Sequence, residues 1–216
     1  MKKIIILSFL SIILMSSCAT KATQKSGADA TIETPFGTMK VKLYDSTPQH
    51  KANFLKLAKE GYYNDLLFHR VINKFMIQGG DPQSKGAATG VMLGSGGPGY
   101  LIPAEIGKKH FKGALAAART GGPGNPDKKS SGSQFYIVQG DIISPAQLQM
   151  LSAQKGFSYT EEETKKYSTI GGTPFLDGDY TVFGEVIEGL DVIDKIAASQ
   201  TDSNNRPFKD VTMKIK

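Results

Sequence analysis

FHRVINKFMIQGGD, residues 68–81, is the most informative stretch of this 216-residue chain. A cation, Arg70, and an amide, Gln78, flank the large apolar pair Phe75 and Met76. A guanidinium beside such an apolar surface suits a site that holds an apolar ligand and polarises one of its carbonyl or nitrogen atoms. The same residues also fit an ordinary barrel strand with a surface arginine, so this pattern alone leaves both interpretations open.

The alternation of side chains breaks within this stretch. Read as one continuous strand, it would place charged Lys74 on the same face as apolar Met76. A bulge or a turn is therefore expected at Asn73-Lys74. The run Gly79-Gly80-Asp81 marks a further turn.

Three more segments follow: GALAAART at 113–120, SGSQFYIV at 131–138 and FLDGDYTVFGEV at 175–186. In this order the four segments resemble the cyclophilins, the peptidyl-prolyl cis/trans isomerases, and the similarity runs from about residue 31 to the C-terminus. The resemblance implies a mainly β fold, a closed antiparallel eight-stranded barrel capped by two helices. It assigns residues 31–216 to one isomerase domain.

The resemblance also implies a site. Arg70 and Gln78 would be catalytic: Arg70 would contact the prolyl carbonyl and approach the imide nitrogen, and Gln78 would orient Arg70. The substrate-binding residues would be Phe75, Met76, Ala118, Arg119, Gln134, Tyr136, Phe175, Leu176 and Tyr180. The implied partners are proline-containing peptides and unfolded exported proteins. The alternative is a peptide-binding chaperone or scaffold on the same fold with little isomerase activity.

Some positions depart from the family pattern. Arg119 stands where the family usually has Asn, Phe175 where many members have Trp, and Tyr180 where many have His. Phe175 keeps apolar bulk but loses an N–H donor. Under the resemblance, the small residues 113–118 would form a strand edge along which a peptide lies, and the glycine-rich run 82–99 would border the groove.

Composition limits the other possibilities. The net charge of +6 falls to +4 without Lys2 and Lys3, which is too small and too scattered to predict a nucleic-acid partner. The single cysteine, Cys18, cannot form an internal disulfide, and no Cys/His cluster has metal-ligand spacing, so neither a metal nor a cofactor is expected. We expect His69 to be structural, packed and hydrogen-bonded, and the protein to be a monomer.

The N-terminus indicates export. Residues 1–17 combine a positive head, an apolar run too short to span a bilayer comfortably, and small residues before Cys18. This resembles a lipoprotein signal peptide, with Cys18 as the lipidation site and residues 18–30 as a flexible tether. An uncleaved anchor or an ordinary signal peptide is the alternative. The expected location is the cell envelope, with a lipid-anchored domain in the periplasm.

Helices are expected outside the four segments. One begins at Thr47-Pro48 and ends near Gly61, and another covers about 190–199. A helical hairpin is expected at about 144–170, inserted between two barrel strands, because Ser144 and Thr160 each begin a capping box. The hairpin could cover one rim of the groove, bind a partner, or only pack against the barrel.

Overall fold

The computed structural model of the protein describes residues 27–216. The expected signal peptide, Cys18 and the tether up to residue 26 therefore lie outside the described residues. The strands are β1 (Ala30–Thr34), β2 (Gly37–Leu43), β3 (Leu66–Leu67), β4 (Arg70–Ile72), β5 (Met76–Gly79), β6 (Leu101–Ile102), β7 (Ala114–Ala117), β8 (Ser130–Ser131), β9 (Phe135–Val138), β10 (Val182–Glu188) and β11 (Thr212–Ile215). The helices are α1 (Pro48–Lys59), α2 (Pro145–Lys155), α3 (Glu161–Thr169) and α4 (Leu190–Ala197), with single 3₁₀ turns at Pro82–Ser84 and Pro174–Leu176.

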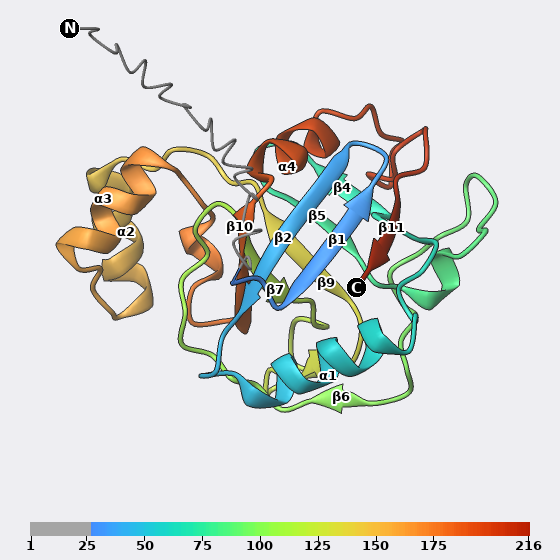
Figure 1. The fold of residues 1–216 in the computed structure, drawn as a ribbon. Coiled ribbons are helices and arrows are strands. Elements are labelled where there is room, and N and C mark those ends of the chain that lie inside the picture. The colour runs from blue at the N-terminus through green and yellow to red at the C-terminus, as the bar shows by residue number, and fades with distance from the viewer. Residues whose placement is uncertain (1–26) are drawn as a thin grey trace, which may run out of the picture.

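Nine strands form one curled antiparallel sheet, in the order β3-β11-β1-β2-β10-β7-β9-β5-β4 (Figure 1). The mainly β prediction is confirmed, but a closed eight-stranded barrel is not. The end strands β3 and β4 follow one another in the chain instead of pairing. The N–H of Phe68 donates to the carbonyl of Val211, and the N–H of Val71 donates to that of Asn205. The 205–211 segment therefore occupies the place where a closing ladder would run.

The 68–81 stretch contains a hairpin. Arg70 pairs with Gln78 across β4 and β5, and the turn between the strands includes Lys74 with a φ of 61°. The turn predicted at Asn73-Lys74 is confirmed. Gly80 has a φ of 89°, and a Cβ there would collide with the carbonyl of Ser133, so the glycine is needed at this bend.

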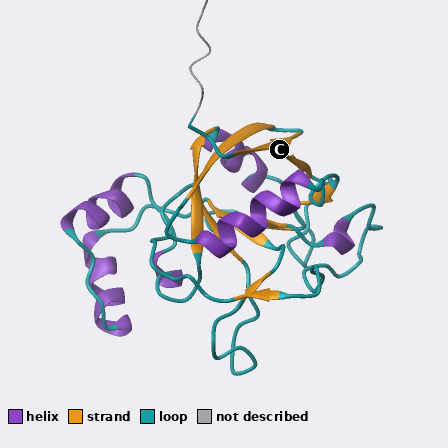
Figure 2. Cartoon of the chain, turned by 60° about the horizontal axis from the view of Figure 1, so that its bottom comes forward, coloured by secondary structure: helices purple, strands orange, loops and turns teal. Residues whose placement is uncertain are grey.

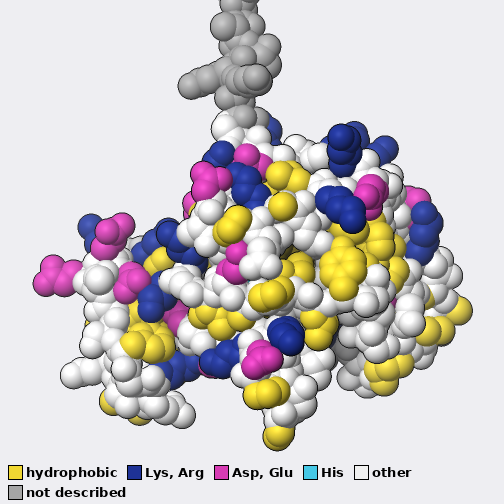
Figure 3. Space-filling view, turned by 90° about the horizontal axis from the view of Figure 1, so that it is seen from below, with side chains coloured by type: hydrophobic (Ala, Val, Ile, Leu, Met, Phe, Trp, Pro, Cys, Tyr) yellow, Lys and Arg dark blue, Asp and Glu magenta, His cyan; other side chains and the backbone are white. Residues whose placement is uncertain are grey.

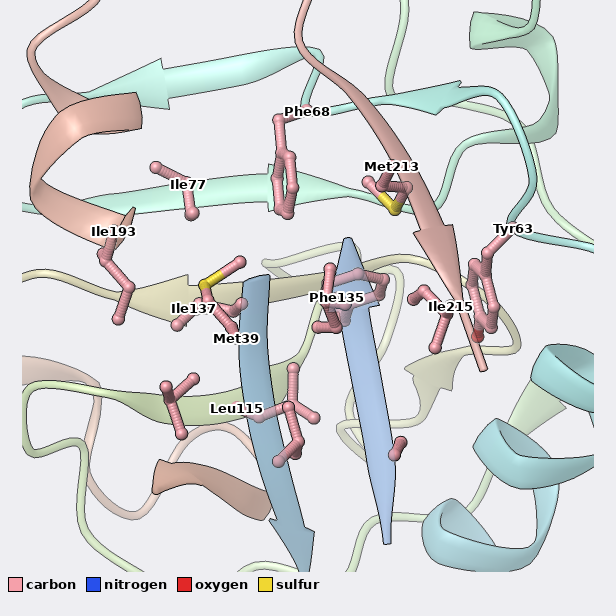
Figure 4. Packing of buried hydrophobic residues seen from close by; sticks show 14 of the residues in the cluster. Met39, Tyr63, Phe68, Ile77, Leu115, Phe135, Ile137, Ile193, Met213 and Ile215 are labelled. Carbon is pink, nitrogen blue, oxygen red and sulfur yellow. The ribbon is translucent and has the colours of Figure 1, made fainter. Parts of the chain in front are cut away.

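The core lies inside the curl of the sheet. Side chains from opposite parts of the sheet, among them Met39, Leu115 and Met213, point into one apolar cluster (Figure 4). Strand β9 divides its residues between this core, which receives Phe135, and a smaller cluster that contains Tyr136. Side chains thus alternate along β9, which leaves Tyr136 available to the site.

Helices α1 and α4 cover opposite ends of the sheet (Figures 1 and 2). Pro48 stands at the start of α1 as predicted, but Thr47 makes no side-chain cap. The carboxylate of Glu105 takes that role from 56 positions away, accepting from the N–H groups of Gln49 and His50 at 3.1 and 3.0 Å. A remote carboxylate at a helix N-terminus satisfies both the unpaired N–H groups and the helix dipole.

The predicted helical hairpin is confirmed as α2 and α3. Both Ser144 and Thr160 form complete capping boxes. The hairpin stands to one side of the sheet, away from α1 (Figures 1 and 2). Lysine and arginine side chains gather along the seam between this projection and the rest of the domain (Figure 3).

Candidate active site

An apolar cavity of about 300 Å³ opens beside the β4–β5 hairpin. Much of its apolar wall comes from one cluster of side chains: Phe75, Met76, Tyr136, Leu176 and Tyr180. They come from three separated parts of the chain: β5 and β9 are neighbours in the sheet, and the ring of Tyr180 lies 5.9 Å from that of Tyr136. The cavity size and its apolar lining suit a single small apolar group such as a proline ring.

Arg70 lies at this cavity, and a chain of amides holds it. Its Nη1 donates to Oε1 of Gln78 at 3.1 Å, and Nε2 of Gln78 donates to Oε1 of Gln134 at 3.2 Å. The guanidinium also lies 5.9 Å from the ring centroid of Phe75. Of Arg70, Arg119 and Arg206, only Arg206 has an ion pair within residues 27–216. The charge of Arg70 is therefore oriented by neutral groups.

The glycine-rich run is fastened to the same chain of amides. Nε2 of Gln134 donates to the carbonyls of Gly94 and Gly96 at 2.9 and 2.7 Å. The buried carboxylate of Asp81 accepts from the N–H groups of the same two glycines. The expectation that this run borders the groove agrees with Gly94 lining the cavity.

Behind the apolar wall runs a buried polar network. Oη of Tyr136 lies 2.9 Å from Nε2 of His110, and Nδ1 of His110 lies 2.8 Å from Oδ1 of Asp177. Tyr167 and Tyr159, from the inserted segment, donate to Oδ2 of Asp177 at 2.7 and 3.1 Å. Burial raises the pKa of Tyr136 and of Tyr167, so both hydroxyls stay protonated and can donate.

Arg119 lies over another part of the wall. Its guanidinium carbon is 4.6 Å from the ring centroid of Tyr180, and its Nε donates to the carbonyl of Asp179 at 2.8 Å. The carboxylate of Asp179 faces Lys128 and Lys155, both at 2.8 Å. Hydrogen bonds from these two lysines lower the pKa of Asp179 to about 2.

A second cavity of about 710 Å³ adjoins the first and is more polar. The glycine-rich run, Thr120, Ser131 and Gln134 line it. Four residues line both cavities: Gln78, Gly94, Ala118 and Arg119. The two cavities therefore form one continuous groove.

The groove collects nearly all of the predicted site residues. Those at the apolar cavity are Arg70, Phe75, Met76, Gln78, Ala118, Arg119, Tyr136, Leu176 and Tyr180. Gln134 lines the second cavity and not the apolar one, and its side-chain amide donates to the glycine-rich run. Phe175 lines neither; it is half exposed, and its ring lies 5.5 Å from that of Phe75, so it supports the wall from outside.

Two expectations are wrong. Residues 113–118 are not a sheet edge, since β7 pairs with β10 on one side and β9 on the other, and Ala118 bonds to Gln134 and Ser131 through its backbone. His69 is buried, as expected, but neither ring nitrogen has a hydrogen-bond partner within residues 27–216. Burial lowers its pKa, and its side chain lines the apolar cavity.

Residues 27–216 contain no cluster of His, Cys, Asp or Glu that could hold a metal ion. In the same part of the chain, no helix has the length and apolarity needed to cross a membrane.

A sequence model of a known family, described as cyclophilin type peptidyl-prolyl cis-trans isomerase/CLD, matches residues 30–216. This chain belongs to that family. A Staphylococcus saprophyticus protein named as a candidate peptidyl-prolyl cis-trans isomerase is 40% identical to this cyclophilin over 180 residues, which cover 82% of the chain and 84% of the relative.

Two other similar proteins are a longer bacterial relative and a cyclophilin of known crystal structure. A Streptococcus pyogenes protein, named as a candidate bifunctional phosphatase/peptidyl-prolyl cis-trans isomerase, is 37% identical over 191 residues, which cover 86% of this chain but 37% of the relative. The crystal structure of a Cryptosporidium parvum cyclophilin in the presence of the dipeptide Ala-Pro is 27% identical, with a TM-score of 0.60, and the match covers 86% of this chain and 96% of that chain.

Reasoning from the sequence missed the supports of this cyclophilin site. The local sequence marks neither Asp81 nor Asp177 as more than a turn residue, yet both are buried and hold loops or rings in place. Arg206 is also buried and donates to the carbonyls of Ala87 and Ala88, which ties the C-terminal segment to the run beside the cavity. These partners are remote in sequence, so no local spacing marks them.

Proposed function

We propose that this cyclophilin catalyses rotation about the Xaa-Pro bond of peptides whose proline ring enters the apolar cavity, with Arg70 as its catalytic residue. The uncatalysed barrier is about 18–20 kcal/mol, because the imide nitrogen donates its lone pair into the carbonyl. The twisted transition state has lost this conjugation. Catalysis therefore needs no nucleophile, only groups that bind the twisted form more tightly than either planar form.

The observation that carries this proposal is that the guanidinium of Arg70 lines an apolar cavity and has no carboxylate partner within residues 27–216. With the ring held by the wall, a donor from Arg70 can bond the imide nitrogen as its lone pair localises, and can bind the prolyl carbonyl. This bond is strongest in the twisted form. A reduction of the barrier by about 6 kcal/mol would raise the rate by roughly four powers of ten.

Cis/trans exchange of Ala-Ala-Pro-Phe, measured by NMR exchange spectroscopy, tests the proposal. The wild-type protein should accelerate exchange, and Arg70→Ala should lower the catalysed rate by about a hundredfold or more, as the loss of a preorganised donor does elsewhere. Arg70→Lys should also be impaired, because an ammonium cannot reproduce the guanidinium fork. Circular dichroism of each variant controls for folding.

Two other outcomes would overturn the proposal. Equal exchange rates in the wild type and in Arg70→Ala would remove the role of Arg70. Binding of the peptide by folded wild type without any acceleration would make the protein a peptide-binding module.

We further propose that the chain is a lipid-anchored form of the family that acts on exported proteins in the cell envelope. The support is the positive head, the short apolar run and the small residues before Cys18. One lipidated residue would hold the domain at a membrane surface through the chain up to residue 30.

Mass spectrometry of the full chain, expressed in a bacterial host and recovered from its membrane fraction, tests the anchor. The N-terminal peptide should begin at Cys18 and carry a diacylglycerol mass. Cys18→Ser should abolish this mass while leaving isomerase activity unchanged. A mature chain with an unmodified Cys18 would contradict the proposal.

A further inference from the structure

Arg119 lies where the two cavities of the groove meet. A peptide with its proline ring in the apolar cavity has to leave that cavity past a residue that both cavities share, and Arg119 is the charged member of this set. A charge at this point interacts most strongly with the substrate residue next to the proline.

The residue before the proline belongs on the side of the second cavity. When the ring is held by the wall, rotation about the imide bond swings the preceding carbonyl and the chain attached to it. That moving part needs room. The second cavity offers about 710 Å³ against about 300 Å³ in the first, and it is the more polar of the two.

Among residues 27–216, the charged side chains that line the groove are all cations. No Asp or Glu of the described part of the chain lines either cavity, whereas Arg70, Arg119 and Arg206 line the first and Arg119 also lines the second. Arg206 is paired with Asp210. Arg70 and Arg119 have no ion pair within residues 27–216, so the groove presents two uncompensated cations.

The surroundings of Arg119 fix the guanidinium without neutralising it. Its hydrogen bonds, from Nε to the carbonyl of Asp179 and from Nη1 to that of Thr120, go to neutral acceptors. Nη2 has no hydrogen-bond partner among the described residues. The carboxylate of Asp179, whose backbone carbonyl accepts from Arg119, is engaged by two lysines and stays ionised at neutral pH because its pKa is about 2.

We propose that Arg119 makes this protein prefer substrates with an acidic residue, Glu or Asp, directly before the proline. A carboxylate entering the second cavity would accept from the Nη2 group of Arg119 and complete its hydrogen bonds. A lysine at that position would meet two cations. This specificity rests on the proposed isomerase function and deepens it.

The test compares three peptides, Ala-Glu-Pro-Phe, Ala-Gln-Pro-Phe and Ala-Lys-Pro-Phe, by the NMR exchange measurement at low ionic strength. The wild type should show a kcat/KM for the Glu peptide about fivefold above that for Gln, and the Lys peptide should be the poorest, as expected for a partly exposed charge-assisted pair. The difference should arise mainly in KM, because the carboxylate is bound in every state of the reaction.

Variants separate the charge from the packing of Arg119. Arg119→Gln should bring the three peptides within about twofold of one another, Arg119→Lys should keep the order, and Arg119→Glu should reverse it. Lys129→Gln is the matched control, because it removes the same charge from the neighbouring loop without lining either cavity. It should leave the order intact.

Salt gives a second, independent readout. The preference for Glu should shrink toward unity in about 1 M NaCl, where the Debye length is about 3 Å. Equal catalysis of all three peptides at low salt, or an unchanged preference in Arg119→Gln, would overturn the inference and leave the isomerase function in place. No acceleration of any peptide would instead overturn the proposed function itself.

Discussion

The side chain that orients Arg70 is an amide and not an acid. Gln78 accepts from Arg70 and at the same time donates to Gln134, whose own amide is occupied by the glycine-rich run. An acid at position 78 would hold Arg70 more strongly but would compete with the substrate for its charge. The amide chain therefore fixes the direction of the guanidinium while its charge remains available to the substrate.

Gln78→Glu tests this reasoning. The new carboxylate would form an ion pair with Arg70 and would face Oε1 of Gln134 without a donor between them. We expect kcat to fall by about tenfold, because the cation is neutralised where the transition state needs it. NMR exchange measures the rate, and a thermal melt checks the fold. Wild-type kcat in this variant would show that the charge of Arg70 is not used.

At the scale of elements, the inserted α2–α3 segment is bonded into the back of the site. Tyr167 and Tyr159 both donate to Asp177, which also contacts His110. Lys155 of α2 reaches the carbonyl of Asp177 and the carboxylate of Asp179. Of the roles considered for the hairpin, packing against the domain is visible in these contacts. Asp177 in turn connects to Tyr136 through the two ring nitrogens of His110.

Removing the hydroxyl of Tyr167 tests how much its hydrogen bond to Asp177 contributes to stability. Tyr167→Phe should lower the free energy of unfolding by about 1–2 kcal/mol, because it leaves a fully buried carboxylate short of a donor. Tyr159→Phe is the matched control and should cost less, since its ring is more exposed and its bond to Asp177 is longer, 3.1 against 2.7 Å. Urea denaturation measures both. Equal, negligible effects would show that the network does not stabilise the fold.

At the scale of the whole molecule, Asp179 joins parts that are far apart in sequence. Its carboxylate binds Lys128 from the 121–130 loop and Lys155 from the inserted segment. These contacts attach a lysine of the loop to the rest of the domain. Since the pKa of Asp179 is lowered in the folded state, its contribution to stability is full above the unfolded pKa and is lost as the pH falls through the folded value.

Asp179→Asn should therefore change the acid response of the protein. Above about pH 5 the variant should be less stable than the wild type by about 1 kcal/mol or less, the range of partly exposed ion pairs. The difference should disappear between about pH 4 and pH 2, where the wild-type carboxylate takes up its proton. Urea denaturation of the wild type and of Asp179→Asn, measured from pH 7 to pH 2, gives this difference in stability at each pH. A constant difference over this range would exclude the ionic contribution.

Short-range features of this structure could be predicted from the sequence, and contacts between distant residues could not. The β4–β5 turn follows from broken alternation at Lys74, and the two capping boxes follow from local spacing, because both are short-range patterns. Membership of the groove was predicted for Arg70, Tyr136 and Tyr180 through the resemblance. The hydrogen bonds of the Glu105, Asp177 and Arg206 side chains were not predicted. Each joins residues that come together only when the chain folds.

The two ends of the described chain meet in the sheet. Thr31 in β1 exchanges backbone hydrogen bonds with Lys216, the last residue of the sequence, and β11 lies between β1 and β3. β1 therefore keeps one side unpaired until β11, at the other end of the described chain, is available to pair with it. Such a distant pairing raises the contact order and delays completion of the sheet. Until that pairing forms, the free side of β1 can pair with a strand of another chain, so folding intermediates of this protein carry a risk of strand-to-strand aggregation.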